Sequence, residues 1–323
     1  MSAMSDHGVI DVPTVVPEAT SSPVAGKEGT WVKALWVELR PSQWLKNLFV
    51  LAPVFFSQNL FAFDAVARCL AALACFCAVS SSVYLLNDLH DREQDRLHPH
   101  KRHRPLASGA LKGWIAQATM IVLLIGALAA SLRLGGSFTA VLAVYWLLNF
   151  AYTVRLKSVV ILDVFVIASG YLLRVIGGAV AIRSRMSAWL LICTTLLALF
   201  IGLCKRRHEI VLLREGATGH RKVLDEYPLP FLDMMIGVIT ASIVVSYSLF
   251  TVSNEVVSKL PLPGLLLTAP FVLYGLFRYL YLVYHKVEGG DPTQSILTDS
   301  PMLVNLLLWT AATGILLYWV ARR

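Results

Sequence analysis

The sequence predicts an all-α integral membrane protein, a bundle of nine transmembrane helices with its large polar loops on the cytoplasmic side. The first observation is composition: of 323 residues, 57% are hydrophobic and only 15% are charged, with a mean hydropathy of +0.66. Soluble domains are about half apolar and about a quarter charged. The second observation is that apolar runs recur at the length of about 20 residues that carries a helix across a bilayer.

The nine predicted spans cover residues 43–61, 64–86, 113–132, 136–154, 159–182, 186–204, 231–252, 262–284 and 302–320. Pro53 and the polar Ser57, Gln58 and Asn59 interrupt the first run, which predicts a kinked or broken helix there.

The first 30 residues differ from the rest of the chain. Residues 1–30 lack the basic and apolar regions of a signal peptide, and their polar composition predicts a disordered tail. We therefore expect one transmembrane domain over residues 31–323.

The distribution of basic residues predicts the orientation. Lys and Arg concentrate before the first span, in 87–112 and in 205–230, so the positive-inside rule places the N-terminus and both large loops in the cytoplasm. The net charge of +8 fits loops that face anionic lipid and phosphorylated substrates better than it fits nucleic acid binding.

An acid stripe follows the second predicted span, formed by Asn87, Asp88, Asp91 and Asp95. At about 100° per residue, these four residues lie within about 100° of one another on a helix that continues out of the apolar run. Clustered carboxylate and amide oxygens suit Mg²⁺, which uses one or two protein carboxylates and completes its shell with water and substrate phosphates.

A basic segment comes directly after the acid stripe. Lys101, Arg102 and Arg104 offer positive charge and hydrogen-bond donors to phosphate oxygens. Together with the acid stripe they predict a Mg²⁺-diphosphate site, and the alternative is a solvated, charged loop between helices. Ionisable groups at the membrane border usually have a function, which favours the site.

Two further places carry polar groups suited to anions. Lys46 follows Trp44 in a segment that either anchors the chain at the membrane interface or turns Lys46 towards a phosphate. Asp163 and Arg174 are eleven residues apart and share one helix face. They either pair with groups on neighbouring helices or line the same pocket as the acid stripe and receive a second anionic group.

Several other chemistries find no support in the sequence. Cys69, Cys75, Cys77, Cys193 and Cys204 lie in or beside apolar runs, so we expect free thiols and no disulfide. The histidines at 98, 100 and 103 have no nearby carboxylate or cysteine partner, so a zinc site is not expected. Rossmann, P-loop and G-x-S-x-G patterns are absent.

Three of these features together resemble the UbiA superfamily of intramembrane prenyltransferases. They are Asn-Asp-x-x-Asp-x-x-x-Asp at 87–95, Arg-Pro-Leu-x-x-Gly at 104–109, and the nine spans. Members of that superfamily bind a polyprenyl diphosphate through Mg²⁺ held by two aspartate-rich motifs. At the place of the second motif this chain has Lys205-Arg206-Arg207-His208-Glu209, which is basic with one acid.

Most of the chain from residue 40 onward resembles one branch of that superfamily more closely than the others, the decaprenyl-phosphate phosphoribosyltransferase branch. The matching motifs are Arg40-Pro-x-Gln-Trp-x-Lys-Asn, Val-Tyr-Leu-x-Asn-Asp, His98-Pro-x-Lys-Arg-x-Arg-Pro, Leu156-Lys157, Tyr171-Leu-x-Arg174 with Gly177-Gly178, and Lys205-Arg206 with Glu209. Members of the branch move 5-phosphoribose from phosphoribosyl diphosphate to a polyprenyl phosphate, releasing pyrophosphate, on the way to lipid-linked arabinose for the cell envelope. One acid stripe with three basic clusters suits the three phosphate-bearing groups of these substrates.

The resemblance implies roles for particular residues of this chain. Asn87 and Asp91 are the expected Mg²⁺ ligands; Asp88, Asp91 and Asp95 are the expected catalytic carboxylates; Lys46, Tyr84, Lys101, Arg104, Lys205, Arg206 and Glu209 are expected to hold the donor; and Tyr152, Lys157 and Arg174 are expected to hold the lipid phosphate. The expected location is the bacterial cytoplasmic membrane, with homo-oligomer formation left open.

Two alternatives remain at this point. The first is transfer from a polyprenyl diphosphate to an aromatic acceptor by the same fold. The second is an ion-coupled transporter or flippase that uses the acid stripe as an ion site, and the lack of paired broken helices in symmetric halves counts against it.

Overall fold

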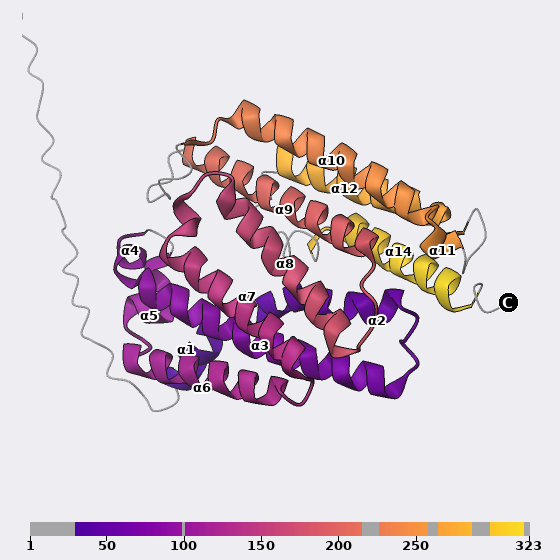
Figure 1. Cartoon of the computed structure of the whole chain (residues 1–323). Helices are drawn as coiled ribbons and strands as arrows, with labels where there is room; N and C mark the ends of the chain where they lie inside the picture. Colours follow the sequence, from indigo (N-terminus) through magenta and orange to yellow (C-terminus); the bar gives the residue numbers. More distant parts are fainter. Residues whose placement is uncertain (1–29, 99–100, 215–225, 258–263, 286–297, 320–323) are drawn as a thin grey trace, which may run out of the picture.

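The computed structural model describes residues 30–98, 101–214, 226–257, 264–285 and 298–319. These residues form helices and no strand, so the predicted all-α class is confirmed for them, while the predicted tail at 1–30 lies almost wholly outside them. Eight segments of the described chain are long and apolar enough to cross a membrane (Figure 1). They comprise α3 (Phe63–His90), α6 (Gly113–Ser131), α7 (Gly136–Val154), α8 (Leu162–Ala181), α9 (Ala188–Arg214), α10 (Leu229–Thr251), η5 (Gly264–Thr268) continued by α12 (Ala269–His285), and α14 (Ser300–Tyr318).

The first predicted span is broken, as its sequence indicates. It consists of a 3-10 helix, η1 (Pro41–Leu51), and a short α-helix, α2 (Ala52–Phe56), which has a proline in its first turn and is followed by Gln58 with a φ of 62°. A short helix, α1 (Thr30–Glu38), precedes it. Within the described residues the bundle therefore has eight spanning segments plus this broken segment, rather than nine continuous helices.

The broken segment lies directly against α8, because α8 carries a glycine, Gly178, at the point of contact. A Cβ atom at Gly178 would lie 2.0 Å from the carbonyl oxygen of Val50, and one at Gly177 would lie 2.6 Å from the ring of Phe76. Any larger residue at Gly178 would push the backbone of η1 away from α8. Gly178 therefore fixes the position of η1 relative to α8, whereas Gly177 lets Phe76 of α3 pack against α8.

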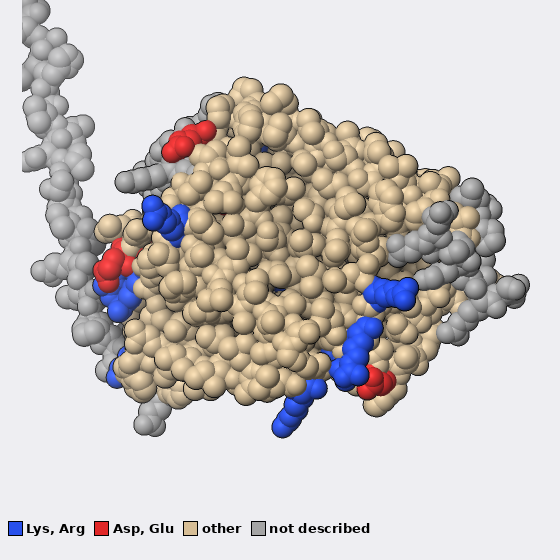
Figure 2. Space-filling view, viewed as in Figure 1, with Lys and Arg blue, Asp and Glu red and all other residues tan. Residues whose placement is uncertain are grey.

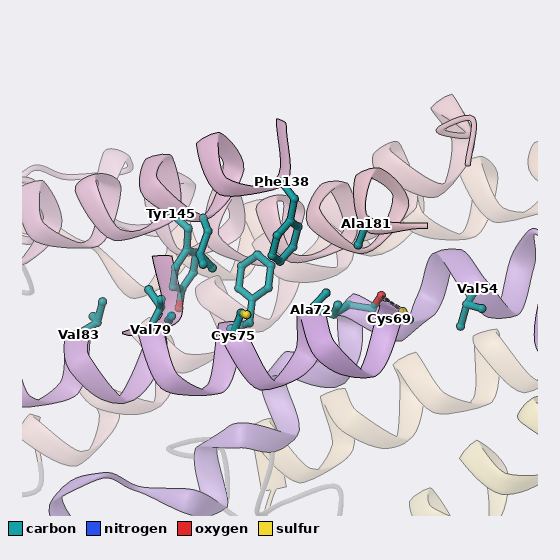
Figure 3. Close-up of a cluster of buried hydrophobic side chains, with 13 residues drawn as sticks. Val54, Cys69, Ala72, Cys75, Val79, Val83, Phe138, Tyr145 and Ala181 are labelled. Carbon is teal, nitrogen blue, oxygen red and sulfur yellow. Dashed lines mark hydrogen bonds between the residues drawn. The ribbon is translucent and has the colours of Figure 1, made fainter. Parts of the chain in front are cut away.

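The first half of the bundle has an aromatic and aliphatic core. Phe76 of α3 contacts Phe138 and Tyr145 of α7 edge-on, with ring centroids 6.0 and 5.3 Å apart. Figure 3 shows Tyr145 and Phe138 projecting from α7 towards Cys75 and Val79 of α3. The ring of Tyr145 is thus held by packing, which fixes where its hydroxyl group lies.

Polar side chains gather at the ends of the bundle. The short elements α4 (Arg92–Leu97), η2 (Lys101–His103), α5 (Pro105–Ser108) and η3 (Leu156–Ser158) lie at one end, where α9 continues beyond its apolar part to Arg214; α11 (Asn254–Val257) lies at the other (Figure 1). In Figure 2 the charged side chains visible on this face lie at the two ends, and the broad surface between them is almost uncharged. We call the end that carries α4 and α5 the polar end.

Candidate active site

The acid stripe lies where α3 ends at the polar end. Asp91 is the residue that joins α3 to α4, and the helical hydrogen bonds continue across it: Asp91 N donates to Asn87 O at 2.9 Å and Asp95 N donates to Asp91 O at 2.8 Å. The backbone is therefore close to helical across this stretch. It places Asn87, Asp88, Asp91 and Asp95 on one face, as the sequence predicts. This shared face could be predicted from the sequence because the acids recur at the 3.6-residue period of an α-helix.

Two of the three aspartates are buried in a network of ion pairs. Asp88 and Asp95 are only 1% and 4% exposed. Arg104 bridges them, with its Nη1 3.0 Å from Asp88 Oδ1 and 2.6 Å from Asp95 Oδ2, and Arg40 pairs with the other oxygen of Asp88. Arg40 also stacks over the ring of Tyr84 at 5.2 Å. Arg104, a predicted donor-binding residue, thus joins both ends of the acid stripe.

The third aspartate, Asp91, is more accessible and fits a magnesium ligand. Its side chain is 15% exposed, and its Oδ1 accepts a hydrogen bond from Lys157 Nζ at 2.6 Å. Asn87 is half-buried beside it. One carboxylate and one amide oxygen suit Mg²⁺, because this ion usually keeps several waters and takes its remaining ligands from substrate phosphates. In the described part of the chain no group of three or more His, Cys, Asp or Glu side chains is arranged to enclose a metal, so substrate oxygens would have to complete the shell.

Glu38 is a site residue that the sequence did not reveal. It ends α1, is 2% exposed, forms a side-chain hydrogen bond with Asp88, and has its Oε1 buried without a hydrogen-bond partner. Burial, followed by the nearby Asp88, raises the pKa of Glu38 to about 8, although Arg40 and Arg104 act to lower it. A hydrogen bond between two carboxyl groups requires one proton, and the high pKa assigns that proton to Glu38 at neutral pH.

This pKa predicts a pH-dependent stability. Between the ordinary glutamate value near 4.5 and about 8, the folded protein binds a proton at Glu38 that the unfolded chain has released. The free energy of unfolding should therefore fall as pH rises through this window. We expect Glu38→Gln to flatten the pH dependence of the melting temperature in detergent between about pH 5 and about pH 8.5. Glu93→Gln is the matched control because the Glu93 side chain is 75% exposed, and equal slopes for wild type and Glu38→Gln would contradict the assignment.

Arg174 is a buried cation at some depth in the bundle. It lies on α8 and is 6% exposed. Its Nε donates to Asn47 Oδ1 at 2.7 Å, its Nη1 to the carbonyl oxygen of Gly170 at 2.9 Å, and its Nη2 to the hydroxyl of Tyr145 at 2.8 Å. Tyr84 lies close enough to Arg40 and Arg174 to interact electrostatically with both, which links Arg174 to the acid stripe.

All the partners of Arg174 in the described residues are uncharged. Its guanidinium also lies 4.8 Å from the ring centroid of Tyr145 and 5.4 Å from that of Tyr171. It forms no ion pair within the described chain, unlike Arg40, Arg104 and Arg206. A buried charge is costly unless it is paired, so this arrangement favours an anionic ligand.

Asp163 and Arg206 form a second buried network, on the other half of the polar end. Arg206 is 1% exposed; its Nε lies 2.6 Å from Asp163 Oδ2, it pairs with Glu209, and its Nη2 donates to the hydroxyl of Tyr152 at 3.1 Å. Tyr227 donates to Asp163 Oδ1 at 2.7 Å. The sequence left open whether Asp163 pairs with a neighbouring helix, and the structure shows that it does, through α9. The predicted contact of Arg206 with the donor stays a prediction.

The remaining predicted residues lie around these groups. Lys46 is on η1 and Lys101 on η2, both half-buried, while Lys205 on α9 lies 4.0 Å from Glu209. The five cysteines are free, as expected. Of the three histidines, His98 and His103 are described, and His100 lies outside the described residues.

A cavity lies farther along α8 from the polar end. Its volume is about 460 Å³ and it begins at Val175, the residue after Arg174, and continues past Ala179. The broken segment contributes Pro53 and Phe56, and α9 contributes Leu190 and Leu191. Its lining mixes these apolar side chains with Ser57, Asn59, Ser184, Arg185 and Ser187, and Arg174 itself does not line it.

The fold and this site define a polytopic helical membrane protein with one carboxylate- and arginine-rich end. The UbiA prenyltransferase family model matches residues 48–293. The chain belongs to the UbiA prenyltransferase family and is an integral membrane transferase.

Three individual proteins resemble the chain along most of its length. It is 31% identical over 310 residues to the decaprenyl-phosphate phosphoribosyltransferase of Mycolicibacterium smegmatis, covering 93% of this chain and 97% of that protein. The protein of the same name from Mycobacterium tuberculosis is 31% identical over 307 residues, covering 93% and 97%. The protein of that name from Corynebacterium glutamicum is 31% identical over 283 residues, which cover 84% of this chain and 82% of that protein.

Solved structures share the fold. A UbiA homologue from Archaeoglobus fulgidus bound to DMAPP and Mg²⁺ superposes with a TM-score of 0.66 at 18% identity, covering 89% of this chain and 99% of that chain. A digeranylgeranylglyceryl phosphate synthase structure gives a TM-score of 0.63 at 16% identity, and the match covers 89% of this chain and 98% of that chain. At these identities the likeness establishes the arrangement of helices.

Proposed function

We propose that the protein transfers 5-phosphoribose from phosphoribosyl diphosphate to a polyprenyl phosphate, in a Mg²⁺-dependent reaction that releases pyrophosphate. The observation that carries this proposal is the buried Arg174, a cation whose described partners are all neutral and which is linked through Tyr84 to the acid stripe. The name shared by the relatives supports the same reaction.

The acid stripe would hold the diphosphate of the donor. Asn87 and Asp91 would bind Mg²⁺, which when bound would neutralise the departing pyrophosphate as a Lewis acid. Lys157, which contacts Asp91, and Arg104, which bridges Asp88 and Asp95, carry positive charge to the same place. Lys46, Lys101 and Lys205 would bind the 5-phosphate and the outer oxygens of the donor, which are anionic.

The buried cation would hold the acceptor. A polyprenyl phosphate combines an anionic head with a long apolar chain, and the buried Arg174 offers a cation for the head inside a bundle whose outer surface carries many exposed apolar side chains. Tyr152 and Lys157 would guide the phosphate towards the donor. The chain would enter sideways between helices, where the protein faces lipid.

The chemistry needs little from a general base. An oxygen of the lipid phosphate, already anionic, would attack C1 of the ribose; the bond from C1 to the diphosphate oxygen would break, and pyrophosphate would leave with the bonding electron pair. The anomeric centre would be inverted. Catalysis would then rest on holding the two anionic substrates in line and on stabilising the leaving group.

The donor preference tests the proposal. Membranes containing the protein are incubated with labelled phosphoribosyl diphosphate and a polyprenyl phosphate, or with a labelled polyprenyl diphosphate and a soluble aromatic acceptor. We expect phosphoribosyl diphosphate to transfer label to the lipid in the organic phase, and the labelled polyprenyl diphosphate to transfer none to the aromatic acceptor. Transfer from the polyprenyl diphosphate instead would support ordinary prenyl transfer, and ion or lipid flux without any covalent product would indicate a transporter.

Arg174→Leu should separate the two substrates. Charge-assisted hydrogen bonds are worth about 1.5–3 kcal/mol, so we expect kcat/KM for the polyprenyl phosphate to fall roughly 10- to 100-fold. The KM for phosphoribosyl diphosphate should stay within about a factor of three, because the acid stripe and its bases are intact. Steady-state kinetics of the purified protein measure both values, and an equal loss for both substrates would reassign Arg174 to a structural role.

A further inference from the structure

We propose that Asn47 is a positioning residue of the acceptor site: it orients the guanidinium of Arg174 and, because it is neutral, leaves the charge of that guanidinium available to an anionic head group. This inference deepens the proposed function and rests on Arg174 as the ligand of the lipid phosphate. Asn47 lies on η1, 127 residues from Arg174 in sequence, and is completely buried.

Both ends of the Asn47 amide are fixed. Its Oδ1 accepts from Arg174 Nε at 2.7 Å, while its Nδ2 donates to Ser80 Oγ at 3.1 Å and lies 3.3 Å from Cys77 Sγ on α3. The amide therefore joins η1, α3 and α8 through one side chain. Hydrogen bonds at both ends define which atom faces Arg174.

The backbone brings Asn47 to this position. Gly178 lies one turn beyond Arg174 on α8, and Val50 lies three residues after Asn47 on η1. Because a Cβ at Gly178 would come within 2.0 Å of Val50 O, only glycine allows η1 to approach α8 closely enough for the contact between Asn47 and Arg174. The close approach of the two helices and the buried amide are thus parts of one arrangement.

Counting the hydrogen-bond donors of Arg174 shows what this arrangement leaves for a ligand. A guanidinium has five N–H groups. Asn47, Gly170 and Tyr145 accept from three of them in the described chain, one each on Nε, Nη1 and Nη2. One N–H on each terminal nitrogen remains for a ligand. Two such groups form the planar fork that binds two oxygens of a phosphate.

The identity of residue 47 decides whether this fork carries net charge. A carboxylate at the same place would accept the same hydrogen bond from Nε, and the hydroxyl of Ser80 could turn to donate to its second oxygen. The helices would stay joined, yet Arg174 would be neutralised before any substrate arrived. A purely structural role for residue 47 predicts that aspartate is tolerated, whereas an electrostatic role predicts that it is not.

Equilibrium binding with the variant Asn47→Asp tests the inference without requiring turnover. Labelled farnesyl phosphate and farnesol are dialysed against purified full-length protein in detergent, and the preference for the phosphate over the alcohol is measured. We expect the wild type to prefer the phosphate and Asn47→Asp to lose roughly 10- to 100-fold of that preference. Farnesol binding and the melting temperature should remain near the wild-type values.

Two further variants sharpen the result. Asn305→Asp, the same substitution at a half-buried amide that donates to Phe271 O on the other half of the bundle, should keep the preference. In an Arg174→Gln background, Asn47→Asp should lower the preference much less than it does in the wild type, since the charge that it neutralises is gone and only repulsion by the new carboxylate remains.

The outcomes separate the inference from the proposed function. An Asn47→Asp protein that still prefers the phosphate overturns the inference, and so does one that loses farnesol and farnesyl phosphate equally, because the pocket would then have collapsed. A wild-type protein with no preference for the phosphate overturns Arg174 as the acceptor site of the proposed function, whatever residue 47 does.

Discussion

Asp91→Asn should remove nearly all turnover while the protein remains folded. Asp91 is the most accessible carboxylate of the acid stripe, and its described ion-pair partner, Lys157, lies on η3 near the end of the bundle. Asparagine keeps the shape but removes the negative charge that Mg²⁺ requires. Because electrostatic stabilisers of this kind contribute about 10²- to 10³-fold or more, we expect kcat to fall by roughly 10³-fold.

The control for this variant is Asp64→Asn, which makes the same change in the first turn of the same helix, at an exposed position. It should keep wild-type activity. Size-exclusion chromatography and thermal melting in detergent report whether Asp91→Asn is folded. An unfolded Asp91→Asn protein would show that Asp91 holds the polar end together, and a folded, active one would remove it from the metal site.

Arg206→Met should have the largest effect on stability. Arg206 is 1% exposed and Asp163 is completely buried, so removing the arginine leaves a buried carboxylate whose described partner is the hydroxyl of Tyr227. Breaking a buried ion pair from one side typically costs about 3–5 kcal/mol. We expect a loss of that order in the free energy of unfolding, measured by chemical denaturation in mixed detergent.

The double variant Arg206→Met/Asp163→Leu identifies the cause. Replacing a whole buried pair by apolar residues is often neutral, so the double variant should be more stable than Arg206→Met alone. The contrary result is an Arg206→Met protein that unfolds at the same denaturant concentration as the wild type and loses only affinity for the donor. The guanidinium of Arg206 would then bind the donor and would not stabilise the packing of α9 against α8.

The sequence predicts the helices well because their signals are local. The predicted spans at 113–132 and 136–154 match α6 and α7 to within one residue. The helices α3 and α9 run past their predicted apolar spans to His90 and Arg214, because their polar ends are helical but carry no hydropathy signal; the acid stripe predicts this continuation for α3. The acid stripe was predictable for the same reason, since its spacing is a property of one helix.

The partners of the charged residues were not predictable in this way. Glu38 and Arg40 contact Asp88 across about fifty residues, and Asn47 contacts Arg174 across 127. Such contacts depend on how η1 packs against α3 and α8. Asn47 also carries no charge, so a search of the sequence for ionisable groups passes over it. The sequence predicts that Lys205, Arg206 and Glu209 hold the donor, but it does not reveal that α9 buries Arg206 against Asp163.

The mass of the lipid product tests the central claim most directly. Purified protein is incubated with phosphoribosyl diphosphate and a polyprenyl phosphate, with and without Mg²⁺, and the organic extract is analysed by mass spectrometry while pyrophosphate is measured in the aqueous phase. The account predicts that the lipid phosphate gains one phosphoribosyl unit for each pyrophosphate released, only with Mg²⁺. An unchanged lipid phosphate, from protein that instead consumes a polyprenyl diphosphate and prenylates an aromatic acceptor, would contradict it.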